Sequence, residues 1–205
     1  TTTGTQTYNG AVTLGADTSL TTTNSLVWFK STVGNSSARA LTISSGTGGV
    51  TFANTVGAST ALGAISISGS GTTTFSGAVT AASLSSGTGT TAINGGSVTT
   101  TGTQTYNGAV TLGADTTLSG TTINTGSTVD GGGYSLTVTG NADVDGDISN
   151  VNVLSVSGTS NLGANITTTG TQTYSGAVTL SGANRTLSGT TINTGSTVDG
   201  GGYSL

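Results

Sequence analysis

This chain repeats itself, and the repeats limit its fold more than its composition does. Residues 1–18, TTTGTQTYNGAVTLGADT, recur without change at 99–116, and a third copy begins at residue 167. The run SGTTINTGSTVDGGGYSL occupies both 119–136 and 188–205. A shorter core, an aromatic residue followed by Asn or Ser and Gly-Ala-Val-Thr, starts at Tyr8, Phe75, Tyr106 and Tyr174. Such self-similarity is typical of architectures in which each unit stacks on the next.

Within a unit, apolar residues come singly or in alternating pairs, flanked by Thr or Ser and separated by Gly, Asn or Asp. An example is the series Val110, Leu112, Leu118, Ile123 and Val129. No helical stripe fits this series, which predicts strands of three to five residues with one buried face, divided by glycine-rich turns. About 22 residues hold three such strands, which is the size of one β-solenoid coil.

We therefore predict an all-β fold, a single-stranded right-handed parallel β-helix of roughly nine coils and about 43 Å in length. One continuous solenoid segment would cover residues 1–205, with its internal repeats at 1–18, 99–136 and 167–205. The final copy halts where the earlier one continues, and no polar capping unit is evident at either end. We expect this segment to belong to a longer array or to be the unit of an end-to-end fibre.

The composition is compatible with coils in which side chains of the same type lie above one another. Thr, Gly and Ser supply 113 of the 205 residues, only 5% are charged, and there is no Pro, Cys, His or Met. Stacked Thr and Asn can hydrogen-bond to their copies, whereas stacked like charges repel. Proline would remove a backbone donor from the ladder. A narrow core should admit Val, Ile, Leu and Ala but leave little room for aromatic rings.

The same composition argues against several classes of function. Without His or Cys, the commonest general base, metal ligand and thiolate nucleophile are missing, so we predict that the chain is not an enzyme. Three cations, Lys30, Arg39 and Arg185, are too few to neutralise a run of phosphates, which argues against nucleic-acid binding. No stretch approaches the about 20 apolar residues of a membrane span.

One acidic segment resembles a calcium loop. Asn141, Asp143 and Asp145 fall at positions 1, 3 and 5 of the EF-hand pattern, with Gly146 at position 6. The match ends at position 12, where Asn152 replaces the bidentate Glu. The predicted calcium ligands are Asn141, Asp143, Asp145 and Asp147. The alternative is a solvated turn, in which case the chain has no cofactor.

Two further features suggest contact surfaces. Leu26 to Lys30 is the densest apolar stretch, and strand alternation places Trp28 and Phe29 on opposite faces. Trp28 and Phe29 are candidates for contact with a glycan or another partner, the alternative being a locally widened core. The Thr-Gln-Thr segments resemble the Thr-x-Thr arrays of ice-binding solenoids. Because these copies recur on about every third coil, plain structural threonine is the favoured interpretation.

The blocks YNGAVTL and LSGTTI, together with the long run that contains them, resemble the repetitive stalk of filamentous-haemagglutinin-like adhesins and related autotransporter passengers. The resemblance covers nearly the whole chain. In that family the stalk is a right-handed parallel β-helix, secreted across the outer membrane of Gram-negative bacteria, that holds a binding tip away from the cell. The family's secretion domain, with its Asn-Pro-Asn motifs, has no counterpart in this proline-free sequence.

Two hypotheses about function follow. In the first, the chain is a non-catalytic stalk or fibre-forming segment of a secreted bacterial surface adhesin or extracellular filament, self-associating end to end or laterally. In the second, it is a binding module whose solenoid face recognises glycan, ice or calcium. An exposed aromatic or acidic side chain that recurs on successive coils would favour the second.

Overall fold

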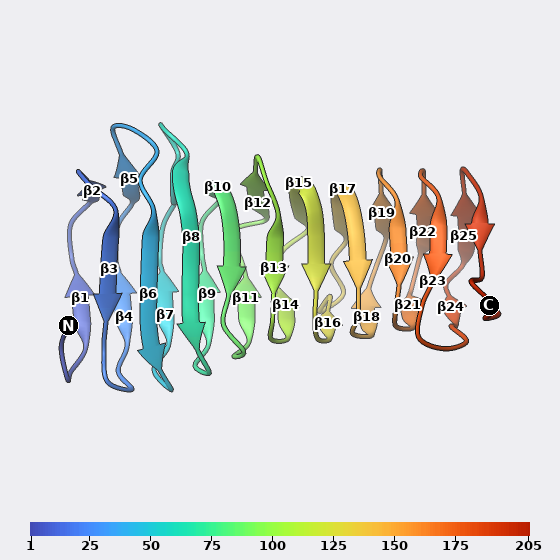
Figure 1. The fold of residues 1–205 in the computed structure, drawn as a ribbon, viewed down its shortest axis with the longest axis horizontal. Helices are drawn as coiled ribbons and strands as arrows, with labels where there is room; N and C mark the ends of the chain where they lie inside the picture. The colour runs from blue at the N-terminus through green and yellow to red at the C-terminus, as the bar shows by residue number, and fades with distance from the viewer.

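The computed structural model describes all 205 residues as a β-solenoid with no helix (Figure 1). Every strand pair is parallel, and the coils stack along one axis with the two termini at opposite ends of the rod. Each coil is a rung with three faces, and short strands form these faces. The predicted all-β parallel solenoid is therefore confirmed.

Face 1 is a sheet of ten strands, one per rung. In order along the rod, the face 1 strands are β1 (Gln6–Tyr8), β4 (Val27–Phe29), β7 (Val50–Phe52), β9 (Thr73–Phe75), β11 (Thr91–Ile93), β14 (Val110–Leu112), β16 (Val129–Asp130), β18 (Ile148–Val151), β21 (Ile166–Thr168) and β24 (Leu187–Ser188).

Faces 2 and 3 share four long strands that run around the corner between them: β8 (Leu62–Gly69), β10 (Val79–Ser86), β15 (Thr116–Thr125) and β17 (Leu136–Val144). Face 2 also holds β2 (Val12–Leu14), β5 (Val33–Asn35), β12 (Ser97–Thr100), β19 (Leu154–Val156), β22 (Thr171–Tyr174) and β25 (Thr191–Thr194). Face 3 also holds β3 (Thr18–Thr21), β6 (Leu41–Gly46), β13 (Gln104–Tyr106), β20 (Ser160–Leu162), β23 (Val178–Leu180) and β26 (Val198–Asp199).

The coils are more numerous and less uniform than predicted, since the sequence suggested roughly nine coils of about 22 residues each. Ten rungs are present, and aligned face 1 residues lie 18 to 23 positions apart: 23 from Val27 to Val50, but 18 from Thr73 to Thr91. Corners of different lengths account for the variation, since the chain passes from face 2 to face 3 in eight positions from Val33 to Leu41 but in five from Val79 to Leu84. Nine gaps of about 4.8 Å give a rod about 43 Å long.

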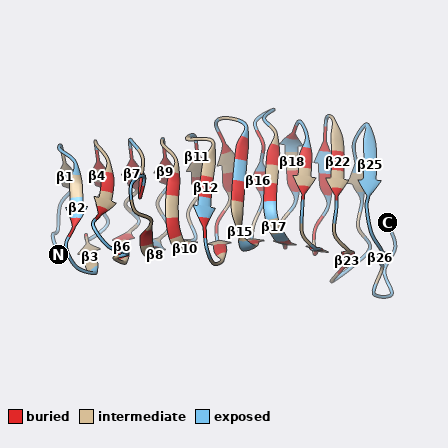
Figure 2. Ribbon diagram, turned by 90° about the horizontal axis from the view of Figure 1, so that it is seen from above, coloured by how far each residue is buried: buried red, intermediate tan, exposed pale blue.

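One continuous core of 38 buried apolar residues runs through the rungs. In the three-residue strands the outer two side chains point inward and the middle one points outward, so that burial alternates along each strand (Figure 2). This is the period of two that the sequence pattern predicted.

The expectation that the core has little room for aromatic rings is wrong. Tyr8, Phe29, Phe52 and Phe75 stack on one another along face 1, with ring centroids 4.8, 4.9 and 5.2 Å apart. Their ring planes lie within 11° of parallel. The rings fit because their positions are aligned on four successive rungs, so that each ring packs flat against the next at the spacing of the rungs.

The three copies of Thr-Gln-Thr-Tyr lie on three different faces. Gln6 is on face 1, Gln104 on face 3 and Gln172 on face 2. The offset from one copy to the next is not a whole number of coils, so each copy reaches a different position around the rod. A sequence repeat is therefore not a structural rung in this protein.

Each copy nevertheless builds the same corner. The Tyr106 hydroxyl donates to Gln104 Oε1 over 2.8 Å, and Gln104 Nε2 donates to the carbonyl oxygens of Val98 and Ser119 over 3.0 and 2.8 Å. Thr100 Oγ1 donates to the Gly102 carbonyl over 2.8 Å. The copies at Gln6 and Gln172 contain the corresponding tyrosine and threonine bonds. The motif therefore forms the same polar corner on each of the three faces, and its glutamine also bonds to a carbonyl of the next rung.

Candidate functional site

Trp28 lies on the outward side of β4, and Phe29 lies in the core. The predicted alternation is confirmed, but Phe29 is only 1% exposed within the aromatic stack and cannot contact a partner. The Lys30 Nζ atom sits 4.6 Å from the centroid of the Trp28 ring, a cation–π arrangement. Of the predicted contact pair, only Trp28 stays a candidate.

The aromatic surface does not extend along the rod. Thr7 precedes Trp28 at the aligned position on face 1, and Thr51 and Thr74 follow it. The recurrence of exposed aromatic side chains that would favour a binding module is therefore not present.

The segment proposed for calcium forms part of face 3 and the corner that follows it. Its side-chain oxygens accept hydrogen bonds from the next rung: Asn141 Oδ1 from Thr159 N (3.0 Å), Asp143 Oδ1 from Asn161 Nδ2 (2.8 Å) and Asp147 Oδ1 from Asn165 N (2.9 Å). No group of three or more His, Cys, Asp or Glu side chains is arranged to hold a metal ion. In this structure the segment ties one rung to the next, and calcium binding stays a prediction.

Asp130 makes a related connection at the end of β16. Its Oδ1 accepts hydrogen bonds from Gly132 N and from Asn150 Nδ2, both over 3.0 Å. These bonds, the backbone one first, hold the pKa of the Asp130 carboxyl below its ordinary value. The carboxylate therefore stabilises the turn after β16 and links this rung to the next one.

Face 2 carries a hydroxyl array that the sequence did not reveal. On five consecutive rungs, two outward positions, two residues apart, are both Thr or Ser, and all ten side chains are at least partly exposed. The pairs are Ser97 and Thr99, Thr117 and Ser119, Thr137 and Thr139, Ser155 and Ser157, and Thr173 and Ser175. Hydroxyls thus repeat about every 4.8 Å along the rod and about 6.6 Å along a strand.

Sequence reasoning missed this array because it followed the Thr-Gln-Thr copies. Those copies lie on three faces and form no common surface, whereas the array combines Thr and Ser from unrelated parts of the repeats. Once strand register is known, the outward positions can be read off, but the sequence alone gives no register between coils of unequal length.

The largest hollow of the surface is a neutral groove of about 600 Å³ beside face 3. It lies where the spacing of aligned face 1 positions falls from 23 (Val50 to Thr73) to 18 (Thr73 to Thr91). Polar residues that line it include Asn24, Thr47, Ser66, Ser68, Ser85 and Asn107, and none of its lining side chains is ionisable. Its hydroxyl and amide groups suit a neutral, hydrogen-bonding ligand.

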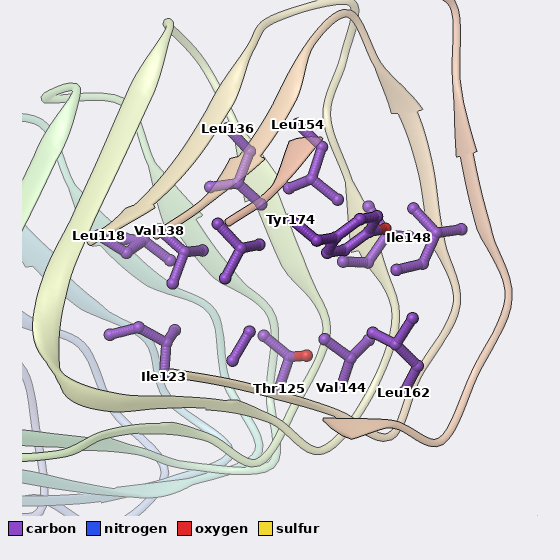
Figure 3. A pocket seen from close by; sticks show the side chains of 13 residues that line it. Leu118, Ile123, Thr125, Leu136, Val138, Val144, Ile148, Leu154, Leu162 and Tyr174 are labelled. Carbon is purple, nitrogen blue, oxygen red and sulfur yellow. The ribbon is translucent and has the colours of Figure 1, made fainter. Parts of the chain in front are cut away.

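A second hollow is a small void of about 20 Å³ inside the rod, between rungs near the C-terminal end (Figure 3). Twelve of its thirteen lining residues are hydrophobic, among them Leu118, Val144 and Leu162. An apolar void of this size is a packing defect of the core and not a ligand site.

The chain matches no protein-family model, no curated protein and no solved structure. The structure contains no helix that could serve as a transmembrane span. A proposal about function therefore rests on the geometry of the rod and on the resemblance of its repeats to adhesin stalks.

Proposed function

We propose that this chain is a non-catalytic structural rod, a stalk or fibre-forming segment of a secreted bacterial surface adhesin or extracellular filament. The observation that carries the proposal is the single core that runs without interruption through ten rungs. Each rung contacts only its neighbours, so the number of coils sets the length of the rod. A solenoid of this form can hold whatever is attached to its end at a fixed distance.

The outward surface supports this proposal. The middle outward residue on every rung of face 3 is Ser, Thr, Asn or Asp: Ser19, Thr42, Ser66, Ser85, Thr105, Asn124, Asp143, Asn161, Thr179 and Asp199. Small polar side chains can stack on adjacent rungs with little repulsion. The adhesin role and the extracellular location at the bacterial surface rest on the resemblance of the repeats to adhesin stalks. A glycan partner is proposed at Trp28 because this aromatic ring points outward.

A reflectometry measurement tests the spacer role. One end of the rod is anchored to a flat surface, the other carries a small globular domain, and neutron reflectometry gives the height of that domain. A matched variant lacks two coils, residues 129–165, which end just before Ile166, the residue aligned two rungs after Val129. The height should fall by about 10 Å, two spacings of about 4.8 Å. An unchanged height would contradict the proposal.

The hydroxyl array on face 2 supports a second candidate function, binding to ice. Its two columns present hydroxyl groups at regular intervals over five rungs, and none of the ten side chains is charged. Thermal hysteresis and ice recrystallisation inhibition should be measurable for the native chain and lost in Thr117→Lys/Thr137→Lys. Thr51→Lys/Thr74→Lys, on face 1, is the matched control that should keep the activity. A native chain without effect on ice growth would rule this candidate out.

Calcium binding by Asn141, Asp143, Asp145 and Asp147 has its own test. A ligand that binds only the folded state raises the melting temperature as its concentration exceeds its dissociation constant. A calcium titration up to millimolar concentration should raise the melting temperature of the native chain but not that of Asp143→Asn/Asp145→Asn. No shift in the native chain would exclude the site.

A further inference from the structure

The corner between face 3 and face 1 shortens from rung to rung in the first half of the rod. Between the first inward residues of the two faces, nine positions separate Leu41 from Val50, but only six separate Gln104 from Val110. The two corners between these take eight and seven positions. Because a shorter loop reaches less far from the axis, this edge of the rod recedes over successive rungs. The neutral groove of about 600 Å³ lies along the receding edge.

We propose that this groove binds a neutral oligosaccharide chain, which lies along the rod between Asn24 and Asn107. These two residues sit on corners four rungs apart, so the groove runs about 19 Å along the axis. Thr2 pairs with Thr22 in the turn that precedes Asn24, so the groove is bounded by residues of the rod itself. Trp28 does not line it. The inference goes beyond the proposed rod and does not depend on it.

The floor of the groove consists of small outward side chains on face 3. Ser66 and Ser85 are aligned neighbours, and the larger Thr42 and Thr105 occupy the aligned positions on the rungs before and after them. A third outward serine, Ser68, donates a hydrogen bond to a backbone carbonyl over 3.4 Å. The Ser66 and Ser85 hydroxyls form no such bond within the chain and are available to a ligand.

Asn24 forms the end of the groove nearer the N-terminus and presents a hydrogen-bond donor. Its backbone lies in the left-handed region, with φ at 55°, and its Oδ1 accepts a hydrogen bond from Thr47 N over 3.0 Å. The side chain lies against Gly46, where a Cβ atom would collide with the amide oxygen. Because the oxygen is engaged in this way, the Nδ2 group is left to donate to a ligand.

Asn107 forms the other end of the groove and presents an acceptor. Its Nδ2 donates to the Ser86 carbonyl over 2.5 Å, which leaves Oδ1 to accept a hydrogen bond from a ligand. Between the two ends, Gly87 approaches the Gly69 carbonyl so closely that a side chain there would collide with it. The glycine therefore keeps the middle of the groove open.

The lining of the groove selects the chemical class of the ligand. None of its thirteen residues is ionisable, so a charged ligand would lose hydration without gaining a counter-charge. The one hydrophobic residue, Ile67, is only 4% exposed, so a lipid or an apolar side chain would find little apolar contact. Sugar hydroxyls donate and accept hydrogen bonds, and the serine hydroxyls and asparagine amides can match both. A linear neutral oligosaccharide meets these conditions.

Affinity electrophoresis tests the binding. Native gels are prepared with one of four neutral polysaccharides, namely hydroxyethyl cellulose, soluble starch, dextran or galactomannan. At least one of these gels should retard the native chain relative to a gel without polysaccharide. A gel that contains hyaluronan, a charged polysaccharide, should not retard it. Retardation in none of the neutral gels, or equal retardation in hyaluronan, would overturn the inference.

Filling the floor locates the binding in the groove. Ser66→Leu/Ser85→Leu adds bulk at two outward positions without changing the charge and should abolish the retardation. Thr179→Leu, outward on the same face of a distant rung, is the matched control and should be retarded like the native chain. Thermal melting shows that each variant is folded. Undiminished retardation of the folded double variant would contradict a site in this groove.

A nearly isosteric substitution tests the donor at one end. Asn24→Asp keeps the oxygen that accepts from the backbone but removes the Nδ2 donor, so it should weaken binding by about threefold to tenfold, the net value of one hydrogen bond. Asn165→Asp makes the same change at the same corner of a distant rung, where Oδ1 also accepts a backbone hydrogen bond over 3.0 Å, and should bind like the native chain. Equal effects of the two substitutions would overturn the inference. The spacer role is tested separately, because none of these substitutions changes the number of rungs or the height expected for the rod.

Discussion

Gln104 shows at the scale of one residue how a polar side chain can be fully buried in this rod. Its amide nitrogen donates hydrogen bonds to two backbone carbonyls, and its amide oxygen accepts a hydrogen bond from the Tyr106 hydroxyl, so that none of these buried groups is left unpaired. The sequence marked the motif as repeated, but gave no sign that its glutamine points inward. Glutamine is usually exposed, and only the strand register reveals this orientation.

The repeated motif provides a matched control for substitution of Gln104, because Gln6 occupies the same position in an identical sequence. Gln104→Ala should destabilise the rod by about 2 to 4 kcal/mol, because it leaves the buried Tyr106 hydroxyl without its acceptor and removes one donor from each of two carbonyls. Gln6→Ala removes the same side chain from an identical sequence at the half-exposed end and should cost under about 1 kcal/mol. Urea unfolding of both variants measures the difference. Equal losses would contradict the role of the buried corner.

The buried tyrosines predict sensitivity to alkaline pH. Burial raises the pKa values of the Tyr106 and Tyr174 hydroxyls above their ordinary value, so the unfolded chain ionises first as the pH rises. Stability should be independent of these groups below about pH 10 and should fall above it by up to about 1.4 kcal/mol per pH unit for each tyrosine. Thermal melting of Tyr106→Phe/Tyr174→Phe should show a shallower alkaline decline than that of Tyr134→Phe, an exposed control. Identical declines would refute this explanation.

At the scale of the strand, much of the fold could be predicted from the sequence. Alternation of apolar and hydroxyl residues predicted short half-buried strands, and the repeats predicted their parallel stacking. The face on which each strand lies could not be predicted, because corners of different lengths make the spacing of aligned positions vary from 18 to 23. The same uncertainty hid the hydroxyl array on face 2. It also left open whether Phe29 or Trp28 points outward.

A second carboxylate beside Asp143 on face 3 tests whether like charges on adjacent rungs destabilise the rod. Asn124 is aligned with Thr105 on one side and Asp143 on the other. Asn124→Asp places a second carboxylate directly beside Asp143 and should cost about 1 kcal/mol more than Thr105→Asp, which lies two rungs away. Chemical denaturation at low and high salt measures both. The difference should shrink as salt screens the pair, and a difference of the opposite sign would contradict the rule.

At the scale of the whole molecule, the distance between two aligned residues along the rod depends on how many rungs separate them. It does not depend on their separation along the sequence. Face 1 provides ten aligned outward positions, one on each rung. The same regularity lets one sequence motif serve on three faces. A spacer needs this property, a length that grows by a constant step with each coil.

Spin-label distances along face 1 measure that property most directly, and a chain without cysteine can be labelled at chosen pairs. Double electron–electron resonance between cysteines at Thr51 and Ser149, five rungs apart, should give about 24 Å, and between Thr51 and Ser188, seven rungs apart, about 34 Å. Thr7 and Ser188, nine rungs apart, should give about 43 Å. Narrow distributions that rise linearly with rung number are expected. Broad distributions, or distances that do not grow with rung number, would contradict a stacked solenoid.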